Sequence, residues 1–383
     1  MRLPWSLRAS VLVGHLVPVA LVGAQAGPRP AAIDGRRVEL PVAMTLITGL
    51  RPLPDGRVIA VDAGEKAIRI VDFAARTATQ IGREGQGPNE YRTPRTTLAW
   101  AGDTVLVYDG GGQRLLKVSP GGALAGQIAI PGTLFMNRGV TPPRWASRGR
   151  DIYFEIEPLD FLRDENAPRR ALIARWSPGS EQLDSVAALV TREPERQGRR
   201  LAHFPRHDGW GVTPAGRIAI VRALDYRVEW HGPDITPIVG AVTPHTPVPV
   251  TDREREALEE ALQSGPRPTA SVSGGTGQGR SSSRRSRGSP STPDYPETKP
   301  PFEASDRLGR TGVVVTAEGE VWVTRSRAWN DSIPVVDVFD ERARLVRRVQ
   351  LPPHTRVLYV DSAAVYLARR DADDLEWLVR VAR

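Results

Sequence analysis

Two histidines spaced four residues apart, His203 and His207, are the side chains in this chain that most resemble a metal-binding pair. On an α-helix this spacing would place both imidazoles on one face, where they could ligate zinc. Pro205 lies between them, however, and a proline inside a helix removes a backbone hydrogen bond and clashes with the preceding turn. We therefore expect a loop here rather than a helical metal site.

Three carboxylates lie close together near the C-terminus, on Asp371, Asp373 and Asp374. They lack the glycine and the distal glutamate of a calcium loop, so we expect a solvated hairpin tip between the last two strands. The sequence also has no cysteine, no Gly-x-Ser-x-Gly elbow, no phosphate-binding loop and no helical His-Glu-x-x-His. Common nucleophilic, nucleotide-dependent and zinc-dependent chemistries therefore have no motif in this chain.

Charged residues in a glycine-rich connector are candidate binding residues. Arg83, Glu84, Glu90 and Arg92 could line one mouth of a ring-shaped protein, because loops often carry binding residues. Packing and turn formation explain the same stretch without any ligand, and this is the interpretation that we favour.

Seven of the nine tryptophans divide into two groups by their surroundings in the sequence. Those within strand patterns are expected to pack in the core, because large aromatic side chains bury most of their surface there. They are Trp100, Trp230, Trp322 and Trp377. Those with less regular surroundings are the better candidates for ligand contact. They are Trp145, Trp210 and Trp329.

The elements that must position these residues are predicted by the stretch from Ile81 to Asp109. A connector with three glycines leads into an apolar strand at Thr97–Trp100, a turn at Gly102 and Asp103, and a second strand at Val105–Tyr108. The pattern returns at a fixed distance. At an offset of 47, Val58 and Asp62 coincide with Val105 and Asp109. Recurrence at this distance is typical of the four-stranded blades of a β-propeller.

Six such units can be placed along the chain, and turns such as Asp55-Gly56 separate their strands. Their approximate bounds are 46–81, 96–130, 151–190, 217–230, 312–351 and 356–381. The last unit supplies only three strands, and a closed ring leaves no unpaired edge. We therefore predict that residues 36–40 pair beside residues 375–381 and close the ring.

An interruption lies between the fourth and fifth units. Thr251 to Glu254 has the spacing of a capping box, and apolar residues then recur at helical intervals, so we predict one short helix at Asp252–Gln263. Residues 265–300 are rich in Ser, Gly, Pro, Thr and Arg, and we predict that they form a disordered low-complexity insertion. An anion-binding role for its arginines is the less favoured alternative to a solvated linker.

The N-terminal 26 residues have the pattern of a secretory signal peptide: Arg2 and Arg8, an apolar run, and the small-x-small site Ala24-Gln25-Ala26. A membrane anchor is disfavoured because the apolar run is short and contains His15 and Pro18. We expect cleavage near Gly27 and export to the periplasm or the extracellular space. Residues 27–383 are then expected to form a single propeller domain. We expect the mature protein to be a monomer and to have no transmembrane segment after cleavage.

The net charge of +8 does not indicate nucleic-acid binding. The signal peptide carries +2 and the insertion +4, which leaves +2 for the rest of the chain. A nearly balanced globular part lacks the basic surface that nucleic acid requires.

The run Gly82-Arg83-Glu84-Gly85-Gln86-Gly87-Pro88-Asn89-Glu90-Tyr91, followed by Pro94, resembles the glycine-rich signature that opens NHL-type repeats. The expected mature chain is similar in layout to exported bacterial six-bladed β-propellers of the NHL and gluconolactonase-like superfamily. The signature occurs only once, since the connector at 131–145 and the approach to Gly312 lack its glycine spacing. The resemblance therefore implies the fold rather than one functional family.

Two functional hypotheses follow. The first is an exported, non-enzymatic binding module for a protein, peptide or glycan, because no catalytic constellation is evident. The second, which the resemblance implies, is a metal-dependent hydrolase or lyase with a divalent cation held in the central channel. Its ligands would converge from several blades and need share no spacing in the sequence.

Overall fold

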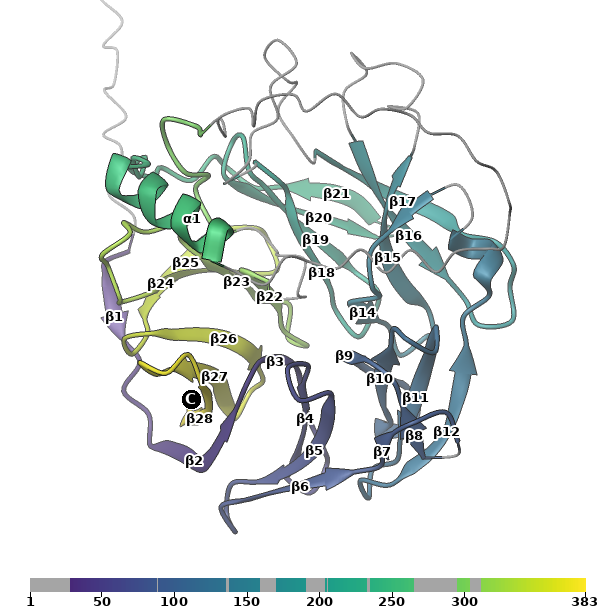
Figure 1. Cartoon of the computed structure of the whole chain (residues 1–383). Helices are drawn as coiled ribbons and strands as arrows, with labels where there is room; N and C mark the ends of the chain where they lie inside the picture. Colours follow the sequence, from purple (N-terminus) through teal and green to yellow (C-terminus); the bar gives the residue numbers. More distant parts are fainter. Residues whose placement is uncertain are drawn as a thin grey trace, which may run out of the picture.

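A computed structural model describes most of the chain. The described residues are 28–87, 89–135, 138–158, 170–190, 204, 206–232, 235–264, 295–303 and 311–383. Within these ranges the chain forms six antiparallel sheets around a ring (Figure 1), which is a six-bladed β-propeller. The predicted fold class and number of blades are confirmed.

Each blade is a meander whose first strand is innermost. Blade 1 contains β3 (Ile47–Pro52), β4 (Val58–Asp62), β5 (Ala67–Asp72) and β6 (Thr77–Ile81). Blade 2 contains β9 (Pro94–Ala99), β10 (Val105–Asp109), β11 (Arg114–Val118) and β12 (Leu124–Ala129). Blade 3 contains β13 (Arg138–Val140), β14 (Trp145–Ala146), β15 (Ile152–Pro158), β16 (Arg170–Trp176) and β17 (Asp184–Val190).

The second half of the ring repeats this plan. Blade 4 contains β18 (Gly209–Val212), β19 (Ile218–Arg222), β20 (Arg227–Gly232) and β21 (Ile235–Val239). Blade 5 contains β22 (Val313–Val315), β23 (Val321–Thr324), β24 (Val335–Phe339) and β25 (Leu345–Gln350). Blade 6 contains β26 (Thr355–Val360), β27 (Ala364–Arg370), β28 (Glu376–Ala382) and β2 (Arg37–Met44).

The two ends of the blades form the two faces of the ring. In blade 1, Ile47 at the start of the first strand pairs with Asp62 at the end of the second. We call this end of every blade the upper rim: it carries the turns between second and third strands and the ends of the fourth strands. The opposite end is the lower rim. There, Gly56, Gly216 and Gly319 occupy equivalent turns with φ of +86°, +85° and +88°, a conformation that glycine adopts without strain.

The ring is closed by the N-terminal strand, as predicted. β2 pairs with β28 in the register Arg37 to Val381, Val38 to Arg380 and Glu39 to Val379. A second contact was not predicted: β1 (Pro30–Ala32) runs parallel to β25 and adds a fifth strand to blade 5. It covers an outer edge that would otherwise expose unpaired backbone groups.

The hydrophobic core consists of six clusters, one at each interface between neighbouring blades. Trp230 and Trp322 are buried in two of these clusters and Trp100 packs against a third, as expected. Trp377 differs from the prediction, because it is only half-buried. Its indole donates to Asp371 at 2.6 Å and lies under the Arg369 guanidinium. It therefore contributes to a polar hairpin rather than to a core.

The interruption after blade 4 begins as predicted. α1 spans Asp252–Ser264, and the Thr251 hydroxyl accepts a hydrogen bond from the Glu254 backbone at 3.3 Å. Residues 265–294 of the predicted insertion lie outside the described residues, and residues 295–300 lie within them. Paired backbone occurs within and just after the end of the predicted insertion, because Thr298 pairs with Pro249 and Phe302 with Arg325. In the part of the chain that the structure describes, no helix has the length and apolarity to cross a bilayer. The predicted signal peptide lies outside that part.

Three smaller elements complete the fold. The 3₁₀ turn η1 (Ala101–Asp103) joins β9 to β10 within blade 2, and η2 (Gly132–Phe135) lies in the connection from blade 2 to blade 3. The glycine-rich connector forms a two-stranded parallel sheet from β7 (Arg83–Glu84) and β8 (Glu90–Tyr91).

Candidate functional site

The charged residues of the glycine-rich connector are engaged with one another and with the blades. The Glu90 carboxylate accepts bonds from Arg83 Nε at 2.8 Å and from the Gly87 backbone at 2.7 Å. Glu84 pairs with Lys66 at 2.6 Å, and Arg92 donates to the Gly111 carbonyl at 3.3 Å. The structure thus places these four predicted residues at the upper rim of blades 1 and 2, where they hold the connector in shape.

The three candidate tryptophans lie in different environments. Trp145, on β14, is half-buried. Trp210, on β18, is buried and donates from its indole to Glu155. Trp329 is 52 % exposed, in the turn between β23 and β24. The structure brings Trp145 and Trp210 to one core cluster between blades 3 and 4, and of the three only Trp329 is exposed.

The structure describes only part of the histidine pair and all three aspartates that the sequence singled out as possible metal ligands. His203 lies outside the described residues, whereas His207 lies in a non-helical connection before β18, as expected. Asp371 caps its own hairpin tip by accepting bonds from the backbones of Asp373 and Leu375 at 3.0 Å each. Among the residues that the structure describes, no group of three or more His, Cys, Asp or Glu could hold a metal ion. The metal-dependent alternative therefore gains no ligand set from these residues.

A polar cluster that the sequence did not reveal lies between blades 3 and 4. Glu155, on β15, is buried, and its carboxylate accepts bonds from His207 Nε2 and from the Trp210 indole, each at 2.9 Å. The other ring nitrogen of His207, Nδ1, lies 2.6 Å from the Asp208 carbonyl oxygen. Both partners of the imidazole are thus acceptors.

This arrangement determines the protonation state of His207. A carbonyl oxygen and a carboxylate can only accept, so the doubly protonated ring is the form that satisfies both. Burial of the ring lowers the pKa of His207, but the hydrogen bond and charge of Glu155, assisted by Asp208, outweigh it and raise that pKa above 6.5. Burial likewise raises the pKa of Glu155, and His207 and Trp210 lower it by more, so the pKa of Glu155 is lowered.

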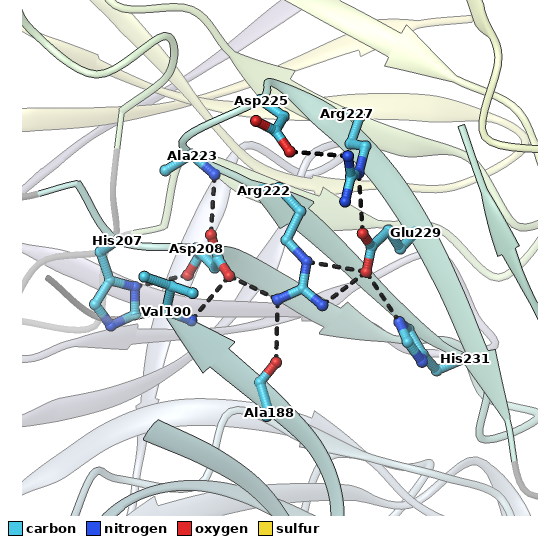
Figure 2. A network of polar contacts seen from close by, with 10 residues as sticks. All are labelled: Ala188, Val190, His207, Asp208, Arg222, Ala223, Asp225, Arg227, Glu229 and His231. Atoms are coloured by element: carbon cyan, nitrogen blue, oxygen red, sulfur yellow. Dashed lines mark hydrogen bonds and ion pairs between the residues drawn. The ribbon is translucent and has the colours of Figure 1, made fainter. Parts of the chain in front are cut away.

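Asp208 extends the cluster across blade 4 (Figure 2). One carboxylate oxygen accepts from the Ala223 backbone at 2.9 Å, and the other accepts from the Val190 backbone at 2.9 Å and from Arg222 at 2.8 Å. Asp208 therefore joins the last strand of blade 3 to the turn between β19 and β20. A buried carboxylate with this many donors acts as a fixed joint between blades.

Arg222 links Asp208 to a second buried carboxylate, Glu229 (Figure 2). Arg222 Nε and Nη2 donate to Glu229 at 2.9 and 2.7 Å, while Arg227 and His231 also contact this carboxylate. Burial raises the pKa of Glu229, but these partners, Arg222 foremost, lower it to about 2. The carboxylate is therefore charged and saturated with donors, which favours a structural role over proton transfer.

The repeat contains a signal that could have located this network. Blades 1 and 2 place Asp62 and Asp109 at the ends of their second strands, where each accepts backbone bonds from the incoming connector. The offset of 160 that relates blade 1 to blade 4 puts Arg222 at the position of Asp62. The charge is reversed at that position, and Asp208 supplies the carboxylate from the connector instead.

Exposed large apolar side chains are concentrated on blades 4 and 5. Of the six large apolar side chains that are exposed among the described residues, five lie at the upper rim of these two blades, with exposures between 36 % and 59 %. We call them the blade 4–5 apolar surface; they are Leu224, Val239, Val242, Trp329 and Ile333. The sixth, Val346, lies near the start of β25 at the lower rim.

The segments that carry this surface are linked below it. Thr243 donates to the Tyr226 carbonyl at 2.8 Å, which places Val242 beside the turn that carries Leu224. The Tyr226 ring stacks on Phe302 with centroids 6.0 Å apart, and Phe302 pairs with Arg325 at the base of the turn that carries Trp329. The two halves of the surface thus rest on one packed core.

The turn that presents Trp329 is braced on several sides. Arg327 Nε donates to the Asp331 carbonyl at 3.0 Å, and Lys299 donates to the Arg327 carbonyl at 2.8 Å. Arg327 also pairs with Glu303, and the His354 backbone donates to Ser332 at 2.8 Å. The backbone of the turn that carries the exposed indole is therefore held by several contacts.

Comparisons with known proteins identify a fold but no family. No protein-family model and no curated protein matches the sequence. Among solved structures, the chain is similar to a member of the DUF4221 family from Bacteroides vulgatus, with 11 % identity, a TM-score of 0.54 and coverage of 94 % of this chain and 98 % of that one.

The chain is also similar to a gluconolactonase from Xanthomonas campestris, with 10 % identity, a TM-score of 0.46 and coverage of 93 % of this chain and 94 % of that one. A further similar structure is the calcium-binding protein regucalcin from Agrobacterium tumefaciens, with 13 % identity, a TM-score of 0.42 and coverage of 92 % of this chain and 95 % of that one. At 11 % identity, the likeness to the DUF4221 structure concerns the fold alone.

Proposed function

We propose that this protein is a non-enzymatic binding module that holds an apolar segment of another protein on the blade 4–5 apolar surface. The observation that carries the proposal is the concentration of five of the six exposed large apolar side chains on one rim of two adjacent blades. Exposed apolar patches of this kind mark interaction sites in soluble proteins. Tryptophan is among the residue types most often found to dominate binding energy at an interface.

The composition of the surface favours a protein segment over a glycan. Four of its five side chains are aliphatic, whereas sugar rings require aromatic planes with polar groups beside them. Nearby charges are already paired within the protein, because Asp225 pairs with Arg227 at 2.8 Å and Arg327 with Glu303. A partner with uncharged apolar side chains complements this surface, since an unpaired charge at an interface core would lose its hydration without compensation.

The test is a selection from a displayed library of random twelve-residue peptides against the purified protein, followed by measurement of Kd for the selected peptides. We expect enrichment of apolar and aromatic residues in the peptides. Leu224→Asp and Trp329→Ala should each weaken binding by at least about ten-fold, as for residues at the centre of an interface.

The matched control is Val346→Asp. It introduces the same charge at an exposed apolar residue, 44 % exposed against 50 % for Leu224, but at the lower rim. Equal losses in Leu224→Asp and Val346→Asp, or a selection that yields no specific peptide, would refute the proposal. Binding of an oligosaccharide array that depends on Trp329 but not on Leu224 would replace the peptide ligand by a glycan.

We also propose that the mature protein is exported and monomeric. The support for export is the N-terminal pattern that ends in Ala24-Gln25-Ala26. N-terminal sequencing and light scattering of the protein recovered from cell fractions test both statements. A cytoplasmic protein that retains Met1 would refute export.

A further inference from the structure

The turn that presents Leu224 is connected to His207 by a short chain of hydrogen bonds. His207 Nδ1 contacts the Asp208 carbonyl at 2.6 Å, and the Asp208 side chain accepts from Ala223 at 2.9 Å and from Arg222 at 2.8 Å (Figure 2). Leu224 directly follows Ala223. The conformation of Asp208 therefore sets the position of the backbone from which Leu224 projects.

The state of this chain depends on one proton. The imidazolium form of His207 donates to Glu155 and to the Asp208 carbonyl at the same time. A neutral imidazole has a single N–H, so one of these two acceptors must lose its donor and face a lone pair instead. Loss of the Glu155 contact would free the His207 ring from β15, and loss of the carbonyl contact would free it from Asp208, the next residue in the chain.

We propose that protonated His207 locks the junction of blades 3 and 4 and thereby holds the Leu224 turn in its binding conformation, so that ligand affinity increases as pH falls. This inference rests on the proposed function and concerns the regulation of the same surface. Differential affinity for the locked and unlocked states is what couples the proton to the ligand.

The charges that face the pair come from several elements. Glu155 approaches from β15, and Arg144, ahead of β14, acts on Glu155. Asp208 lies next to His207 in the chain, and Arg222 from β19 neutralises its carboxylate. The negative charges of Glu155 and Asp208 favour the protonated form of His207. Arg222 contacts the Asp208 carboxylate, whereas the His207 ring contacts the Asp208 backbone carbonyl. The lock requires a charged Glu155 and a protonated His207, so it is fully formed at pH values above the pKa of Glu155 and below the pKa of His207.

The experiment measures Kd for a selected peptide at pH 6 and pH 9 in wild type, His207→Gln and His231→Gln. We expect wild type to bind at least about three-fold more weakly at pH 9, a modest coupling for one proton. His207→Gln should show no such change, because its amide does not titrate. His231→Gln is the matched control: His231 is similarly exposed and contacts Glu229 at 3.3 Å in the same network, but lies away from the Leu224 turn, so it should behave as wild type.

A second measurement requires no ligand. Hydrogen exchange of the Ala223 to Tyr226 amides, corrected for the intrinsic effect of pH, should be at least about three-fold faster at pH 9 in wild type and equal at both pH values in His207→Gln. Unchanged exchange together with pH-independent peptide binding would overturn the lock and leave the binding function intact. If no peptide binds, the binding function fails, and hydrogen exchange alone then decides whether His207 controls the turn.

Discussion

Closure of the ring depends on a buried ion pair at the interface of blades 6 and 1, and its removal should be severely destabilising. Glu376, at the start of β28, is 4 % exposed and pairs with Arg356 of β26 at 2.8 Å. It also accepts from the Ile47 backbone at 2.6 Å, while Arg356 donates to the Ile47 carbonyl. One ion pair therefore connects the last blade to the first strand of blade 1.

The magnitude follows from what each substitution leaves behind. Arg356→Met retains the bulk of the side chain but leaves the Glu376 carboxylate buried with one backbone donor. Breaking a buried pair in this way costs about 3–5 kcal/mol, and we expect about 3 kcal/mol because Arg356 keeps some contact with solvent. The double variant Arg356→Met/Glu376→Gln removes the charge and keeps an acceptor for Ile47, so it should recover at least half of the loss.

The assay is urea unfolding monitored by tryptophan fluorescence, with Arg370→Met as control. Arg370 pairs with Asp374 in the same blade, but both side chains are more than half exposed. An exposed pair of this kind contributes about 1 kcal/mol or less. A loss in Arg356→Met no larger than that in Arg370→Met, or a double variant no more stable than the single one, would show that the ion pair does not hold the ring closed.

Three further predictions concern stability. The pKa of His207 is raised above 6.5, so the stability that it contributes is complete below pH 6.5 and is lost as pH rises through its folded-state pKa. The unfolding free energies of wild type and His207→Gln, measured from pH 6 to 9, should therefore converge at high pH. A difference that stays constant over this range would contradict this prediction. Deletion of residues 28–33 removes the fifth strand of blade 5 and should lower Tm and promote association through the exposed β25 edge, as measured by size-exclusion chromatography; a monomer of unchanged Tm would disagree. Asp62→Ala leaves the Thr45 and Leu46 backbone donors without their partner and should cost about 2–3 kcal/mol in urea unfolding, whereas Asp103→Ala, in an exposed 3₁₀ turn, should cost much less.

Most of the fold was predictable because it depends on local patterns that repeat. Strand alternation and the glycine turns recur at 47 residues, and the coincidence of Asp62 with Asp109 reflects one shared task, the capping of a connector. Blade 3 was harder, since its inner strand is divided between β13 and β14 and both pair with β15. The strand β1 was missed because three residues with a proline carry no strand signal.

The meeting of Glu155 with His207 and Trp210 could not be predicted from spacing. His207 and Trp210 are 52 and 55 residues from Glu155 in the chain, and they meet it only because blade 4 stacks on blade 3. The sequence named Trp145, Trp210 and Trp329 together as candidates for ligand contact, and their neighbours in the chain do not show that only Trp329 of the three is exposed.

The sequence by itself determined the number of blades, the positions of most strands and the pairing that closes the ring, since each follows from residue periodicity and from the need to leave no edge unpaired. Only the tertiary structure decided which charges are buried together and which apolar side chains remain exposed. Those properties depend on the stacking of neighbouring blades, which brings together residues whose distance along the chain is not constrained by any repeat.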